Sequence, residues 1–274
     1  MQLDQAMLDT VRQYFAALSR DITLVLATGE HARRDELKTF LAQIVATSPR
    51  LSLIEQADAA LTSPVSFKLL ADGTDTGIIF SGIPGGHEFS SLILAILQAG
   101  GSALKLDESI QTLIRAVRQP LAFTTYVSLS CHNCPDVVQT LNQFALLNPA
   151  ISSEMIDGGL FQEQIAAKNI QGVPAVYLNG EAFANGKIDT ARLVEKLLER
   201  YPDLASAAAP TESLPLQDVV VIGGGPAGSA AAIYAARKGL KVTVVADRIG
   251  GQVNDTMDIK NLISVPQTTG PQLA

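Results

Sequence analysis

The sequence predicts an α/β protein in which two similar units follow one another and a shorter α/β segment comes last. Three observations predict this class. Strand and helix patterns alternate and then repeat once, a pair of cysteines directly follows one predicted strand, and a glycine-rich turn later joins a strand to a helix. The 274 residues allow about two domains, and a hydrophobic content of 47 % suffices for packed cores.

The first copy of the repeat contains four predicted strands and two helices. Short apolar runs predict strands at residues 21–27, 51–54, 65–70 and 77–81. One helix follows the first strand and another closes the unit, and their expected core faces hold Leu37, Phe40, Leu41, Ile44, Val45, Leu92, Ile93, Ile96 and Leu97. Asp72-Gly73 is typical of the turn of a hairpin.

The second copy repeats this order after a connecting helix. Strands are predicted at residues 121–127, 151–156 and 175–178, and Asn179-Gly180 is a second hairpin turn. Helices are predicted after Cys131, at residues 161–169 and near the end of the unit. The expected core faces of the connecting helix and of the two long helices hold Ile110, Leu113, Ile114, Val117, Val137, Val138, Leu141, Phe144, Ala145, Leu193, Val194, Leu197 and Leu198.

Each copy is therefore a βαβ half followed by a ββα half, and Pro64 and Pro174 open the second halves at equivalent positions. This order is that of the thioredoxin fold. The predicted domains are a thioredoxin-like unit without redox cysteines at 1–119, a thioredoxin-like unit with the cysteines at 120–200, a linker at 201–216 and an incomplete Rossmann-type segment at 217–274. Two unrelated α/β layers, and a short helical cap in place of part of the linker, are the alternatives.

Composition and charge disfavour several functions. The chain carries 20 basic and 27 acidic residues, a formal net charge of −7, which disfavours binding to nucleic acid or to an anionic membrane surface. The first residues show neither a basic nor an apolar signal segment, and the longest apolar stretch, residues 219–240, is interrupted by glycines and a proline. We therefore expect a soluble, cytoplasmic protein.

The two cysteines lie together as Cys131-His132-Asn133-Cys134, at the start of a predicted helix. Two cysteines cannot complete a four-ligand zinc site and the three histidines are far apart in the sequence, so no metal is expected. Free N–H groups and the helix dipole at this position stabilise a thiolate on Cys131. Cys131 is then expected to attack a partner disulfide, and the more enclosed Cys134 to resolve the mixed disulfide.

Val173-Pro174 is the second part of this expected site. A cis peptide bond here would bring the Val173 backbone beside the cysteines, where it can pair with an extended substrate segment; a proline that merely begins a strand is the alternative. His132 either tunes Cys131 or is an exposed spacer. The first copy has Thr28-Gly29-Glu30-His31 in place of the cysteines and cannot perform dithiol chemistry.

Glu88 is the candidate acid–base group of the first copy. It lies in Gly85-Gly86-His87-Glu88-Phe89, a glycine-rich loop that could face the neighbouring cysteines, and it opens the last helix of that unit. An acidic residue in the first turn of a helix, without a catalytic role, is the alternative.

The last segment carries a dinucleotide-binding pattern. A strand at residues 218–222 precedes Gly223-Gly224-Gly225-Pro226-Ala227-Gly228, an alanine-rich helix and a strand that ends at Asp247. Gly223 forms the turn, Gly225 admits a pyrophosphate and Gly228 lets the helix pack on the strand. Asp247 is placed to bind a ribose. The expected cofactor residues are Gly223, Gly225, Pro226, Ala227, Gly228, Asp247, Gly251 and Gln252.

Taken together, the motifs resemble the flavoprotein family of alkyl hydroperoxide reductase, whose flavin part is similar to thioredoxin reductase. The resemblance rests first on the repeat, in which the first copy has a silent site, Thr28-Gly29-Glu30-His31, in place of the cysteines. It rests also on four motifs, which are Ser130-Cys131-His132-Asn133-Cys134-Pro135-Asp136, Asp157-Gly158-Gly159, Gly172-Val173-Pro174-Ala175-Val176, and GGGPAG followed by GGQ. It covers essentially all of the chain, which matches the N-terminal half of that family.

The resemblance implies an oxidoreductase in which NADH reduces FAD and electrons pass through Cys131 and Cys134 to the disulfide of a two-cysteine peroxiredoxin, in hydroperoxide detoxification. It also implies a homodimer formed through the flavoprotein part. The chain lacks the second Cys-x-x-Cys and the second glycine motif, so we expect it neither to oxidise NADH by itself nor to hold FAD well. A general thioredoxin- or glutaredoxin-like reductant, a docking module for the peroxiredoxin and a flavin-binding protein are the alternative functions.

Overall fold

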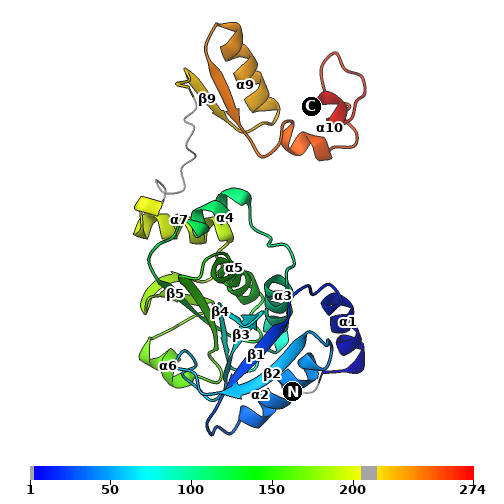
Figure 1. The fold of residues 1–274 in the computed structure, drawn as a ribbon. Helices are drawn as coiled ribbons and strands as arrows, with labels where there is room; N and C mark the ends of the chain where they lie inside the picture. The colour runs from blue at the N-terminus through cyan, green and yellow to red at the C-terminus, as the bar shows by residue number, and fades with distance from the viewer. Residues whose placement is uncertain (1–2, 205–214) are drawn as a thin grey trace. The chain divides into compact units, whose positions relative to one another are not determined.

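The computed structural model describes residues 3–204 and 215–274 (Figure 1), and the chain divides into two units, Met1–Ala209 and Pro210–Ala274. The predicted linker lies mostly outside the described residues. Leu204, near its start, is buried in the core of the first unit. Among the described residues, every helix is too short or too polar to cross a membrane.

The first unit is built on one mixed sheet of eight strands in the order β2-β1-β3-β4-β6-β5-β7-β8. The strands are β1 (Ile22–Ala27), β2 (Leu51–Gln56), β3 (Ser66–Ala71), β4 (Thr74–Ser81), β5 (Leu121–Val127), β6 (Ile151–Asp157), β7 (Ala175–Leu178) and β8 (Glu181–Asn185). All seven strands predicted from the apolar runs are present. Both expected hairpin turns place their Asn or Asp and their Gly at positive φ, as a tight two-residue turn requires.

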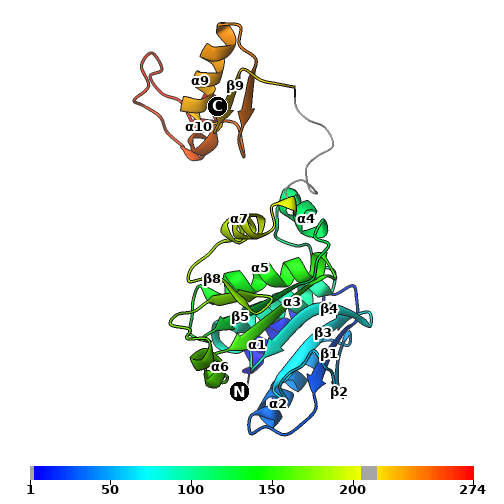
Figure 2. The ribbon, with the colours of Figure 1, turned by 90° about the vertical axis from the view of Figure 1, so that its left-hand side faces the viewer.

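Helices cover both faces of this sheet. They are α1 (Gln5–Phe15), α2 (Arg34–Val45), the 3-10 turn η1 (Gly86–Glu88), α3 (Phe89–Ala99), α4 (Glu108–Arg115), α5 (Cys134–Leu147), α6 (Gln162–Ala167) and α7 (Thr190–Arg200). Helices α3 and α5 lie against each other on one face, where Ser153 of β6 donates a hydrogen bond to Asn142 of α5 (Figure 2). Helix α6 packs on the other face, over Tyr126 and Ile156.

The two halves of the repeat are joined edge to edge within this sheet. Strand β4 of the first half pairs in parallel with β6 of the second, from Ile78 opposite Ser153 to Ser81 opposite Ile156. The pairing gives hydrogen bonds to backbone N–H and C=O groups that would otherwise lack a partner at the edge strand of each half. Because β1, β4, β6 and β5 all run in the same direction, the loops after these strands gather at one edge of the sheet.

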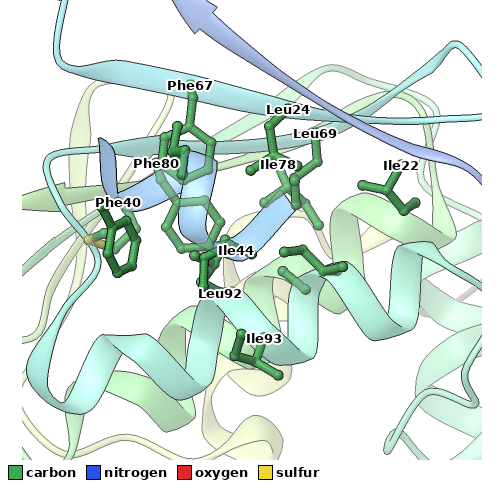
Figure 3. Close-up of a cluster of buried hydrophobic side chains, with 14 of the residues drawn as sticks. Ile22, Leu24, Phe40, Ile44, Phe67, Leu69, Ile78, Phe80, Leu92 and Ile93 are labelled. Atoms are coloured by element: carbon green, nitrogen blue, oxygen red, sulfur yellow. The ribbon is translucent and has the colours of Figure 1, made fainter. Parts of the chain in front are cut away.

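The hydrophobic core also crosses the junction between the halves. One cluster contains most of the buried apolar side chains of the first half, together with Val127, Cys134, Val138, Ala145 and Met155 of the second half. Figure 3 shows part of this cluster. The aromatic rings of Phe40 in α2, Phe67 in β3 and Phe80 in β4 pack with aliphatic side chains such as Leu69 of the sheet and Leu92 of α3. A second cluster fills the space between α4, α5, α7 and the β5–β7 part of the sheet.

The second unit is a parallel pair of strands, β9 (Val219–Ile222) and β10 (Val242–Val245), connected by α9 (Pro226–Arg237) and followed by η2 (Gly251–Asp255) and α10 (Gly270–Leu273). It is the βαβ unit that the glycine pattern predicts. Its apolar side chains are poorly covered: no residue of α9 is buried, and Ile222 is 87 % exposed.

Candidate active site

Cys131 and Cys134 form a disulfide at the carboxyl end of β5, with 5.5 Å between their Cα atoms. Cys134 begins α5, has no exposed surface and belongs to the core, whereas Cys131 is only partly buried. Pro135 lies in the first turn of α5. A backbone N–H there has no acceptor within the helix, so the missing N–H of proline costs no hydrogen bond. The expected difference between an accessible and an enclosed cysteine is therefore confirmed.

The peptide bond between Val173 and Pro174 is cis, as expected from the sequence. The carbonyl oxygen of Val173 lies 3.8 Å from the Sγ atom of Cys131. The Val173 backbone thus borders the exposed side of the disulfide, which is the position expected from the sequence.

The first half of the repeat forms one wall of this site through η1. The backbone N–H of His87 donates a 3.0 Å hydrogen bond to the carbonyl oxygen of Leu129, two residues before Cys131. Gly86 has a φ of +54°, and a Cβ atom added there would lie 2.3 Å from the same Leu129 oxygen. Only glycine permits so close an approach of the two backbones.

Glu88 is the last residue of η1, an element that packs against α5, and it has no exposed surface. Neither carboxylate oxygen has a hydrogen-bond partner in the described part of the chain. Burial raises the pKa of Glu88 to about 7. The expected acid–base candidate therefore lies on an element that packs against the helix of the cysteines, and its raised pKa lies near neutral pH.

His87 is the residue of this site that the sequence pattern did not single out. Its ring lies against that of His132, with 4.1 Å between the ring centroids, and both side chains are exposed. In the sequence His87 is only a neighbour of Glu88. Its position beside His132 follows from the pairing of β4 with β6, which no local pattern reveals.

The silent site of the first half lies at the same edge of the sheet. Gly29 follows β1 with a φ of +120°, and an added Cβ would lie 2.9 Å from Cγ of Pro64, the equivalent of Pro174. The Nδ1 atom of His31 accepts a hydrogen bond from the backbone N–H of Arg33. This loop lies beside Pro64 but differs from the cysteine site, because among the described residues only the Val173-Pro174 bond is cis.

Six of the eight expected cofactor residues of the second unit line one cavity of about 500 Å³. It is lined by Gly223, Gly224, Gly225, Pro226, Ala246, Asp247, Arg248, Gly251, Gln252 and Val253. A Cβ added to Gly225 would meet no atom within 4 Å, whereas one added to Gly228 would lie 1.9 Å from the Gly223 carbonyl oxygen. Gly225 thus leaves open space at the start of α9, and Gly228 permits the tight contact of α9 with β9. These features fit a pyrophosphate and ribose at the helix N-terminus. Ala227 and Gly228 do not line the cavity.

Two family models match different parts of the chain. A family model described as a thioredoxin domain matches residues 123–199, and one described as an FAD dependent oxidoreductase matches residues 218–259. The chain is 44 % identical over 275 residues to the AhpF component of alkyl hydroperoxide reductase from Pseudomonas aeruginosa, covering 99 % of this chain and 51 % of that protein. It is 42 % identical to a protein named NADH dehydrogenase of Bacillus subtilis, over 100 % of this chain and 52 % of that protein.

A solved structure decides the family. The N-terminal domain (NTD_N/C) of the alkylhydroperoxide reductase AhpF of Enterococcus faecalis superposes with a TM-score of 0.67 at 31 % identity, over 72 % of this chain and 100 % of that domain. The chain belongs to the AhpF family of alkyl hydroperoxide reductases. The family resemblance of the motifs and the thioredoxin-like fold of the first unit are thereby confirmed, and the chain spans about half the length of the curated relatives it matches.

Proposed function

We propose that this chain reduces the disulfide of a two-cysteine peroxiredoxin with the dithiol of Cys131 and Cys134. The observation that carries the proposal is the pairing of an accessible Cys131 with a buried Cys134 at the start of α5, in a chain of this family. The Cys131 thiolate attacks one sulfur of the partner disulfide and releases the other as a thiolate. Cys134 then attacks Cys131, which restores the internal disulfide and releases the second partner thiol. Two electrons leave the chain in each cycle.

Glu88 is proposed as the group that accepts the proton of Cys134. A buried thiol must lose its proton before it can attack, and few groups in the core can receive it. A carboxyl with a pKa of about 7, on an element that packs against α5, meets this requirement. The second half at 120–200 thus carries the sulfur chemistry, and the first half at 1–119 contributes the acid–base group and one wall of the site.

In the whole-length proteins of this family we propose that the electrons come from NADH through FAD in a homodimer in the cytoplasm. FAD, when bound, transfers electrons between the nicotinamide and a dithiol. In this chain, Gly223 and Gly225 would approach the pyrophosphate, Asp247 would bind the ribose, and Pro226, Ala227 and Gly228 would begin the helix behind them. Gly251 and Gln252 would close the cavity on its other side. The lining of the cavity is the observation that supports these roles. It concerns one part of the flavin site, because the whole site extends beyond one βαβ unit.

A mixed-disulfide trap tests the proposed partner. Cys134→Ser removes the resolving thiol, so the reduced variant is expected to form a covalent complex with an oxidised two-cysteine peroxiredoxin, detected by mass spectrometry and reversed by dithiothreitol. Cys131→Ser is the matched control and forms none. Rapid reduction of insulin by the intact chain, without capture of the peroxiredoxin, would favour a general reductant. Tight peroxiredoxin binding by both variants, without a covalent complex, would favour a docking module.

A further inference from the structure

We infer that His87 of the first half contacts the partner, and that it recognises a folded protein whose disulfide is attacked by Cys131. The inference rests on the proposed function, in which Cys131 reduces a protein disulfide. It goes beyond that function because it gives the half without cysteines a direct part in substrate specificity. The class of substrate that His87 favours is a protein disulfide, as opposed to a small disulfide that reaches Cys131 alone.

The ring of His87 contacts the residue next to Cys131. It lies against the ring of His132, with 4.1 Å between the ring centroids. His132 directly follows Cys131, so the Cα atoms of these two residues are about 3.8 Å apart. Both imidazoles are exposed, and Cys131 is only partly buried. A side chain of the first half is thus separated by one residue from the cysteine that a partner must reach.

A protein partner that reaches Cys131 covers this surface. In the mixed disulfide, one S–S bond of about 2 Å joins the partner to Cys131. Transient redox interfaces bury up to about 600 Å² on each partner, which as a circle extends about 14 Å from its centre. An area of this size centred on Cys131 includes His132 and the ring that lies against it. A small disulfide covers far less surface and reacts without touching His87.

The first half holds the backbone of His87 in place before a partner binds. The N–H of His87 donates a 3.0 Å hydrogen bond to the carbonyl oxygen of Leu129, and the carbonyl oxygen of His87 accepts a 2.9 Å hydrogen bond from the Ser90 hydroxyl. Gly86 permits the close approach of η1 to Leu129. Because both backbone groups of His87 are bonded, binding a partner costs little backbone entropy at this residue.

The two imidazoles are available for hydrogen bonds across an interface. Among the described residues, neither the ring of His87 nor that of His132 forms a hydrogen bond. His31 in the silent site differs, because its Nδ1 atom accepts a hydrogen bond from the Arg33 backbone. A neutral imidazole has one N–H donor and one acceptor nitrogen. The pair therefore fits a peptide group or a polar side chain beside the partner disulfide, rather than an apolar patch.

A comparison of a protein disulfide with a small disulfide tests this inference. Reduced chain is mixed in a single turnover with an oxidised two-cysteine peroxiredoxin or with the aromatic disulfide dithiobisnitrobenzoate. Cys131 attacks the small disulfide and Cys134 then resolves the adduct, so each chain releases two thionitrobenzoate ions. We expect His87→Ala to lower the ratio of the two second-order rate constants, protein over small disulfide, by at least about fivefold. The loss should raise the partner concentration that gives half the maximal rate.

Thr112→Ala is the matched control, because Thr112 is an exposed residue of α4. Asn148, just after α5, donates hydrogen bonds to the carbonyl oxygens of Ile114 and Val117, so α4 ends beside the end of α5 that is remote from Cys134. Helix α5 has 14 residues and is about 21 Å long. The ratio of rate constants in Thr112→Ala is therefore expected to equal that of the unmodified chain.

Two results would overturn the inference. One is an unchanged ratio in His87→Ala, with circular dichroism verifying that the variant is folded. The other is an equal fall of both rate constants, because His87 would then act on the reactivity of Cys131 and not on the partner.

Failure of the proposed function gives a different result. The unmodified chain would then reduce the small disulfide but not the peroxiredoxin, and insulin would take the place of the peroxiredoxin in the same comparison. A fivefold lower ratio for insulin in His87→Ala would support the contact with another protein partner. Reduction of the small disulfide alone would overturn both the proposed function and this inference.

Discussion

The protonation state of Glu88 is the feature through which we propose that the first half of the repeat takes part in the sulfur chemistry. Burial raises its pKa from 4.5 to about 7 in the folded chain. The folded state therefore binds a proton more tightly than the unfolded state does. Below about pH 4.5 the carboxyl is protonated in both states and burial has no electrostatic cost; as the pH rises towards 7 the unfolded state gains by ionising, and the free energy of unfolding falls.

Replacing Glu88 by Gln is expected to remove this pH dependence. Between pH 4.5 and pH 8, the free energy of unfolding of the unmodified chain should fall by about 3 kcal/mol relative to that of Glu88→Gln. The loss arises because the carboxyl ionises at a lower pH in the unfolded state than in the folded state. Chemical denaturation at a series of pH values measures the difference. In the reduced protein, the same variant should change the pH midpoint of thiolate formation, followed by absorbance at 240 nm.

The two readouts separate a structural from a chemical role for Glu88. If Glu88→Gln changes the stability but not the pH midpoint of thiolate formation, Glu88 is a buried structural acid and the proposed proton transfer is contradicted. Glu154, whose pKa burial also raises, contributes to the pH dependence of both proteins and cancels in the comparison.

At the same scale, the sequence predicted those site residues whose positions depend on local spacing. Cys131, Cys134 and Pro174 lie where a strand, a helix start and a strand start must place them. His87 was missed because its partner His132 is 45 positions away in the chain. Their contact depends on how two distant strands pair, and a single sequence does not specify that pairing.

At the scale of elements, the contact between η1 and the loop before Cys131 depends on one glycine. Gly86→Ala would force a Cβ against the Leu129 carbonyl at a positive φ. Gly73→Ala is the matched control, because Gly73 also has a positive φ but an added Cβ meets no atom within 4 Å. Both variants should lose about 1–2 kcal/mol from backbone strain. Gly86→Ala should lose at least about 1 kcal/mol more from the collision.

Denaturation midpoints of the two glycine variants check this prediction, and the rate of alkylation of reduced Cys131 should change in Gly86→Ala alone. Equal losses of stability and equal alkylation rates would mean that the loop moves aside at no cost and that η1 does not position the site.

The elements were predictable to different degrees. Strands β5 and β7 have the predicted bounds, because their apolar runs end at clear turn or loop residues. Helix α1 was not predicted, since within it only Val11 and Phe15 are buried and its apolar periodicity is correspondingly sparse. The junction of β4 with β6 was also beyond local analysis, because both strands carry ordinary alternating patterns that are compatible with several neighbours.

At the scale of the whole molecule, the two units differ in how well their apolar surface is covered. The first unit holds a core that runs across both halves, whereas in the second unit Ile222, Met257 and Ile263 are each more than three-quarters exposed. Burial of apolar surface is the dominant stabilising term in a fold. The second unit is therefore expected to open far more often than the first.

Hydrogen exchange measures this difference directly. Amides of β9 and β10 should exchange at least about tenfold faster than amides of β5 and β6 under native conditions. Addition of FAD should slow exchange at the start of α9 if the cavity binds the pyrophosphate, and should leave β5 unchanged. Equal protection of the two pairs of strands would show that the second unit is stabilised by contacts other than its own core.

The central claim, that the Cys131–Cys134 dithiol is an electron donor to a peroxiredoxin, is tested most directly by a single-turnover transfer. Reduced, desalted chain is mixed with an oxidised two-cysteine peroxiredoxin, and new peroxiredoxin thiols are counted over time. We predict two new peroxiredoxin thiols for each chain oxidised, and none with Cys131→Ser. Absence of transfer while both thiols of the chain remain reduced would contradict the claim.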